Sequence, residues 1–149
     1  MPTVAASSLR PVRLDLTPVE VAARLRQRAG LVFFDSALDG ARGSQLSVIA
    51  AEPTRIFRGS LENDAPLLRE ALATHRTEPA DLGVPAGFLA GSVDYDSTFC
   101  FGEYEHALIY RHADASWMEV GDGAALLRGL ATLLEHERLS ASAAVPPAV

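Results

Sequence analysis

The chain has 149 residues, of which 48% are hydrophobic and 21% are charged, a balance that fits one globular domain with its own core. Thirteen basic and nineteen acidic residues give a formal net charge of −6. Because no Lys/Arg cluster is present to follow a phosphate backbone, we expect no nucleic-acid partner.

The sequence also argues against a membrane or secreted protein. No segment approaches the roughly 20 apolar residues that a membrane helix needs, and the start lacks an apolar stretch of signal-peptide length. Cys100 is the only cysteine, so an internal disulfide is impossible and a cysteine-based zinc site would lack its usual ligands. We therefore expect a cytoplasmic protein that does not bind membranes.

The first half of the chain predicts one helix followed by strands. Thr17-Pro18-Val19-Glu20 combines a capping hydroxyl, a proline suited to the first turn and a glutamate three positions after the cap, so a helix should begin here and end at Gly30. Three short segments with strand-like apolar patterns follow at 31–34, 45–51 and 55–58. Pro53 separates the second segment from the third.

The second half predicts a helix near Asn63-Asp64, ahead of Pro66, with an apolar side made of Leu67, Leu68, Ala71 and Leu72. The segment 86–96 is strand-like, but it carries Gly87 and Gly91, which suggests a bulge or the close approach of another backbone. Next, 107–111 and 116–120 have the pattern of a hairpin, and Asp122 should cap a last helix.

These elements predict an α+β domain in which a mostly antiparallel sheet is covered by two to three helices. We expect a flexible N-terminus over 1–13, the domain over 14–138, and an Ala/Pro-rich linker or tail over 139–149. One face or edge of the sheet should remain open for another domain, which predicts an exposed apolar patch.

Two motifs together resemble a known family. The first is Asp35-Ser36 at a strand end, followed by the segment from Ser47 to Pro53; the second is the segment from Gly87 to Asp96, which contains Gly91 and Tyr95. Their order and separation are similar to those in the N-terminal domain of anthranilate synthase and aminodeoxychorismate synthase component I. The resemblance covers roughly Leu14 to Glu137, with Phe88 and Gly102 departing from the family pattern.

The resemblance implies a non-catalytic regulatory or scaffold domain of a chorismate-using synthase in folate or tryptophan precursor biosynthesis. Chorismate, Mg²⁺ and the chemistry belong in this family to a C-terminal catalytic domain, which would act in cis or in trans, in some cases beside a glutamine amidotransferase subunit. We accordingly expect no catalytic residue, metal or cofactor in this chain.

The resemblance also implies a pocket for L-tryptophan. Asp35 would face the ligand ammonium group, the Ser36 hydroxyl would hydrogen-bond the ligand, and Gln45 and Ser47 would lie nearby. The remaining motif residues would be structural: Pro53, Gly87, Gly91, Tyr95 and Asp96. The alternative function is a stand-alone small-molecule-binding or protein-interaction module derived from this domain.

Other candidate sites are weaker. Cys100 and His106 could form a nucleophile pair, but a cysteine between two phenylalanines is usually a small buried apolar residue. The carboxylates of Asp94, Asp96, Glu103 and Glu105 match no calcium-loop spacing. The histidines His75, His112 and His136 form no metal-binding pattern, and the glycine loop 39–44 lacks the lysine of a phosphate loop.

Overall fold

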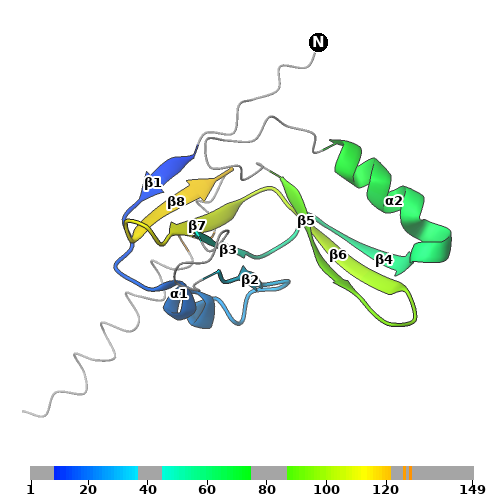
Figure 1. The fold of residues 1–149 in the computed structure, drawn as a ribbon, viewed down its shortest axis with the longest axis horizontal. Helices are drawn as coiled ribbons and strands as arrows, with labels where there is room; N and C mark the ends of the chain where they lie inside the picture. The colour runs from blue at the N-terminus through cyan, green and yellow to red at the C-terminus, as the bar shows by residue number, and fades with distance from the viewer. Residues whose placement is uncertain (1–8, 37–44, 75–86, 122–125, 127, 129–149) are drawn as a thin grey trace, which may run out of the picture.

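The computed structural model describes residues 9–36, 45–74 and 87–121, together with Leu126 and Arg128. Two helices and eight strands lie in these residues, and every strand pair is antiparallel. The α+β class predicted from the sequence is therefore confirmed (Figure 1).

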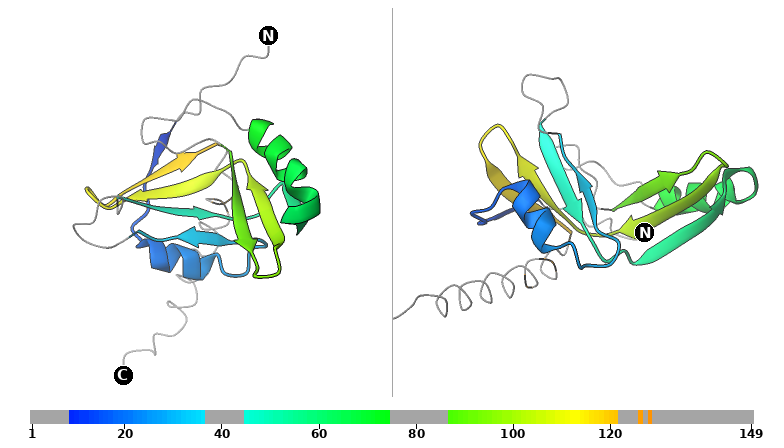
Figure 2. Two further views of the ribbon diagram at one scale, coloured as in Figure 1. Left: turned by 45° about the vertical axis from the view of Figure 1, so that its right-hand side comes forward. Right: turned by 90° about the horizontal axis from the view of Figure 1, so that it is seen from below.

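The strands form two sheets rather than the single sheet that the sequence suggests. A five-stranded sheet has the order β1 (Arg10–Val12), β8 (Ser116–Val120), β7 (Ala107–Arg111), β3 (Leu46–Ala50) and β2 (Val32–Phe34). A three-stranded sheet has the order β4 (Arg55–Ser60), β6 (Thr98–Tyr104) and β5 (Phe88–Val93). Figure 2 shows the two sheets side by side, with β6 of one leading directly into β7 of the other.

Strand β1 lies inside the segment 1–13, for which the sequence suggests a flexible N-terminus. Its residues pair with β8, and Arg10 forms an ion pair with Glu119 at 3.0 Å. The Arg10 guanidinium also donates to the Gly121 carbonyl oxygen. The described domain therefore begins before residue 14.

Helix α1 (Pro18–Arg24) begins where the capping signal predicts. The Thr17 side chain accepts a hydrogen bond from the Glu20 amide, and the Glu20 carboxylate accepts one from the Thr17 amide, so both halves of a capping box are present. The helix ends at Arg24, well before Gly30. Gly30 has a different role, because its φ of +62° and the nearby Pro53 ring leave no room for a side chain.

The main core lies between α1 and one face of the five-stranded sheet. Val21 of α1 and Leu25, the C-cap residue of that helix, pack there with Ile49 and Leu108, and all four side chains are fully buried. Trp117 is buried beside them, and its indole N–H donates to the Leu16 carbonyl oxygen at 2.8 Å. This bond satisfies the one polar atom of a large buried ring.

Helix α2 (Leu61–Thr74) covers one face of the three-stranded sheet and begins before the predicted Asn63-Asp64 signal. Ser60 explains the earlier start, because its hydroxyl accepts from the Glu62 amide while Asp64 accepts from the Ser60 amide. Ala71 is buried, yet Leu67 and Leu72 are 47% and 53% exposed. The predicted apolar side of this helix is thus only partly covered.

Several predictions lie outside the described residues. The loop 39–44 and the tail 139–149 are among them, as is nearly all of the helix expected after Asp122. Leu126 is described and is fully buried in the core beneath α1.

Gly91 in β5 meets the backbone of β6 closely, as the glycine spacing suggests. A Cβ atom at this position would lie 2.0 Å from the Cys100 carbonyl oxygen. Since that neighbour is backbone within a paired strand, it cannot move aside without breaking the ladder.

Replacing Gly91 with alanine should therefore destabilise the domain, lowering the free energy of unfolding by about 3 kcal/mol. Urea denaturation followed by circular dichroism measures this effect. The matched control is Ser92→Ala on the same strand, where the side chain is exposed. Equal stability of the two variants would contradict the close approach.

Candidate functional site

The five-stranded sheet brings three polar residues together at one end. Asp35 directly follows β2, Ser47 is the second residue of β3, and His112 directly follows β7. The pairing of Phe34 with Val48 sets Asp35 opposite Ser47, and Ser47 pairs with Tyr110 of β7. Because strand side chains alternate between faces, these residues share the face on which α1 packs.

The three side chains form a continuous hydrogen-bonded group, here called the Asp35 cluster (Asp35, Ser47 and His112). The Ser47 hydroxyl donates to Asp35 Oδ1 at 2.6 Å, and His112 Nε2 lies 2.7 Å from the same hydroxyl oxygen. His112 Nε2 is 3.9 Å from Asp35 Oδ1. Ser47 is fully buried, whereas Asp35 and His112 are partly exposed.

Aromatic rings continue from the cluster across the sheet. The Tyr110 ring contacts His112 edge-on, with centroids 5.0 Å apart, and contacts Trp117 on its other side at the same distance. The cluster therefore lies where the apolar core meets the strand ends. A partly exposed carboxylate next to aromatic surface suits a ligand that has both a cationic group and an apolar body.

The residues predicted for the tryptophan pocket are brought together only in part. Asp35 and Ser47 are hydrogen-bonded to each other, and Gln45 joins through its backbone, since its carbonyl oxygen accepts from the His112 amide at 3.0 Å. The Gln45 residue itself is exposed. Ser36 is half-buried beside Asp35 and makes no side-chain hydrogen bond with a described residue.

His112 is the site residue that the sequence reasoning missed. The sequence shows only that it belongs to no metal-binding pattern, whereas in the structure it is hydrogen-bonded to the buried Ser47. The sequence gives one sign that His112 could join Asp35, namely that both residues directly follow a strand. This sign has no meaning until the pairing of β3 with β7 is known, because that pairing brings His112 next to Ser47.

The geometry does not fit a serine nucleophile. In a catalytic triad the carboxylate binds the imidazole and the imidazole takes the serine proton. Here the carboxylate accepts from the serine itself, and the Ser47 oxygen is buried, so no substrate can reach it. The arrangement instead fixes the position of a carboxylate.

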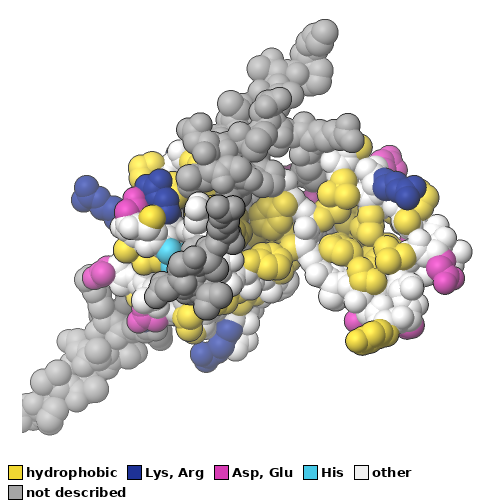
Figure 3. All heavy atoms as spheres, viewed as in Figure 1, with side chains coloured by type: hydrophobic (Ala, Val, Ile, Leu, Met, Phe, Trp, Pro, Cys, Tyr) yellow, Lys and Arg dark blue, Asp and Glu magenta, His cyan; other side chains and the backbone are white. Residues whose placement is uncertain are grey.

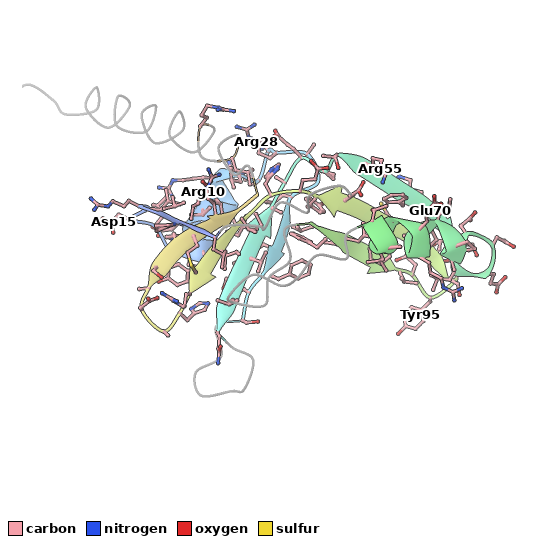
Figure 4. The ribbon with its side chains drawn as sticks, turned by 90° about the horizontal axis from the view of Figure 1, so that it is seen from above. Arg10, Asp15, Arg28, Arg55, Glu70 and Tyr95 are labelled. Atoms are coloured by element: carbon pink, nitrogen blue, oxygen red, sulfur yellow. The ribbon has the colours of Figure 1, made fainter. Side chains whose placement is uncertain are left out.

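The second motif lies in the other sheet. Gly87 is buried before β5 and Gly91 is within β5, whereas Pro53, the last residue of the first motif, lies between β3 and β4. Tyr95 is fully exposed at the turn between β5 and β6, and Figure 4 shows it at the end of the molecule remote from Arg10. Asp96 accepts hydrogen bonds from the amide and hydroxyl of Thr98, which lower the pKa of its carboxyl.

The other candidate residues from the sequence, namely the Cys100 and His106 pair and the acidic residues, are not brought together into one site. Cys100 lies in the middle of β6, while His106 lies beyond the end of that strand, in the link to β7. Glu103 is buried and paired with Arg55 in the three-stranded sheet. In the part of the chain that the structure describes, no three His, Cys, Asp or Glu side chains are grouped to hold a metal ion.

Comparison with known proteins found no match to this chain among family models, curated proteins or solved structures. Neither described helix has the length and apolar character needed to cross a bilayer.

Proposed function

We propose that this chain is a non-catalytic regulatory and scaffold domain of a chorismate-using synthase, of the aminodeoxychorismate or anthranilate synthase component I kind. Its main partner is a chorismate-binding catalytic domain, which carries the Mg²⁺ ion and the chemistry. The order and spacing of the Asp35-Ser36 and Gly87–Asp96 motifs support this family assignment.

The observation that carries the scaffold role is the exposed apolar surface of the three-stranded layer. Figure 3 shows hydrophobic side chains gathered over the three-stranded sheet and α2. The large exposed ones are Leu61, Leu67 and Leu72 of α2, Val93 on the face of the sheet where α2 packs, and Tyr95 at the following turn. Ile56 is also exposed, but the strand register sets it on the opposite face of the sheet. Monomeric domains bury most such side chains, and a concentration of them is typical of a docking surface.

The Asp35 cluster supports the regulatory role. The Asp35 carboxylate is partly exposed, and only its Oδ1 atom is engaged by Ser47. A free α-amino acid presents an ammonium group that forms charge-assisted hydrogen bonds with such a carboxylate. L-Tryptophan, the ligand that the resemblance implies, adds an indole ring for the nearby aromatic surface.

The docking role predicts that Leu72→Glu weakens binding to a separately purified chorismate-binding domain of aminodeoxychorismate synthase component I. Placing a charge where about 2 kcal/mol of leucine burial is expected should raise the dissociation constant at least tenfold. Analytical ultracentrifugation of the mixture measures this constant.

Val19→Glu is the matched control, because Val19 is equally apolar and exposed but lies on α1. It should bind like the unmodified chain. Equal binding by both variants, or no binding by the unmodified chain, would contradict a docking role for the three-stranded layer.

The ligand role predicts saturable binding of L-tryptophan in a calorimetric titration at pH 8, with L-phenylalanine binding more weakly. Ser36→Leu should abolish binding by filling the space beside Asp35. Ser92→Leu is the control, since Ser92 is exposed on β5 in the other sheet. If tryptophan binds and Ser36→Leu has no effect, the pocket assignment is wrong.

A further inference from the structure

His112 belongs to neither sequence motif, yet it completes the Asp35 cluster. Its Nε2 atom lies 2.7 Å from the Ser47 hydroxyl oxygen, and that hydroxyl donates its only proton to Asp35 Oδ1. The Ser47 oxygen can therefore only accept from the imidazole, so Nε2 must carry a proton. This requirement defines one tautomer of the neutral ring.

Each group in the cluster donates to the next: the His112 imidazole donates to the Ser47 hydroxyl, and the Ser47 hydroxyl donates to the Asp35 carboxylate. Because Ser47 is fully buried, its hydroxyl has few alternative partners, and the imidazole N–H keeps it turned toward Asp35. The Asp35 side chain is more exposed and would otherwise be free to rotate toward water. His112 thus determines, through Ser47, where one carboxylate oxygen lies.

Protonation of His112 changes the charge next to this carboxylate. The imidazole Nε2 is 3.9 Å from Asp35 Oδ1, so an imidazolium ion would pair with the same group that an amine ligand needs. The imidazolium would also repel the ligand's ammonium group.

The other charged groups near the cluster are engaged elsewhere, so they do not act on Asp35 as a protonated His112 would. On β7, Tyr110 contacts the imidazole with its ring edge, and the neighbouring Arg111 side chain alternates to the opposite face. Arg111 is paired with Asp114, and this pairing, with a bond from Ser116, holds the pKa of the Asp114 carboxyl at about 2. On α1, Glu20 is bonded to its own cap residue, Thr17. The one carboxylate close to His112 among the described residues is Asp35.

We propose that His112 is a positioning residue that makes the Asp35 cluster available to amine ligands only while its imidazole is neutral. The neutral ring orients Asp35 through Ser47, whereas the charged ring competes with the ligand for the carboxylate. This inference rests on the proposed function for the identity of the ligand, but the positioning role can be measured without any ligand.

The first test is the tautomer of His112 in the chain without ligand, measured from long-range ¹H–¹⁵N correlations of the imidazole rings. At pH 8 the ring should be protonated on Nε2 and bare on Nδ1. Ser47→Ala should abolish this preference and Ser36→Ala should leave it unchanged. A neutral ring protonated on Nδ1 overturns the proposal, whatever the ligand result.

The second test is the pH dependence of L-tryptophan binding, measured by calorimetry at pH 8 and pH 5.5. Because the charged ring competes with the ligand for Asp35 and repels its ammonium group, the affinity at pH 5.5 should be roughly tenfold lower than at pH 8. His112→Gln should bind at pH 8, because its amide can still donate to Ser47, and should lose the pH dependence. His112→Ala should bind weakly at both pH values.

The two tests separate the inference from the proposed function. The expected tautomer without tryptophan binding would contradict the proposed function and support the positioning role. Binding with the same affinity at both pH values in the unmodified chain would overturn the competition between imidazolium and ligand. A His112→Gln variant that keeps the full pH dependence would do the same.

Discussion

The Tyr104 side chain joins the two sheets, and the rest of the fold depends on this junction. Its hydroxyl donates to the Gly30 carbonyl oxygen at 2.6 Å, and its ring stacks on Phe88 with centroids 5.5 Å apart. Burial in this position raises the pKa of Tyr104. A Cβ atom on Gly102 would lie 2.8 Å from the Tyr104 ring, and one on Gly30 would lie 2.6 Å from Pro53. Both glycines are therefore needed because a tyrosine and a proline pack between the sheets.

The junction also explains how one chain builds a polar site and an apolar surface in separate places. The chain passes from the five-stranded to the three-stranded sheet at Glu52, whose φ of +57° turns the backbone and whose amide donates to the Ala29 carbonyl oxygen. It returns after Tyr104, where β6 leads into β7. The five-stranded sheet can then close one face with α1 and keep the Asp35 cluster at its end. The three-stranded layer keeps several of its large hydrophobic side chains exposed, as the proposed docking role requires.

The sequence predicts correctly those elements that depend only on residues close together in the chain. The capping box of α1 and the hairpin of β7 and β8 form where the pattern predicts, because each depends on residues a few positions apart. Gly30 does not end the helix as the sequence predicts, because the constraint on this glycine is the distant Pro53 ring. The division into two sheets could not be predicted either, because strand alternation is the same whichever sheet a strand joins. His112 was missed for a related reason. Its hydrogen bond to Ser47 spans 65 positions in the sequence and exists only through the pairing of β3 with β7.

We propose that this chain assists chorismate chemistry without performing it. The most direct measurement follows product formation from chorismate, Mg²⁺ and ammonia with the chain alone, with a chorismate-binding catalytic domain alone, and with both together. We predict no product from the chain alone and a higher rate for the mixture than for the catalytic domain by itself. Turnover by the chain alone, or a catalytic-domain rate that the chain does not change, would contradict the account.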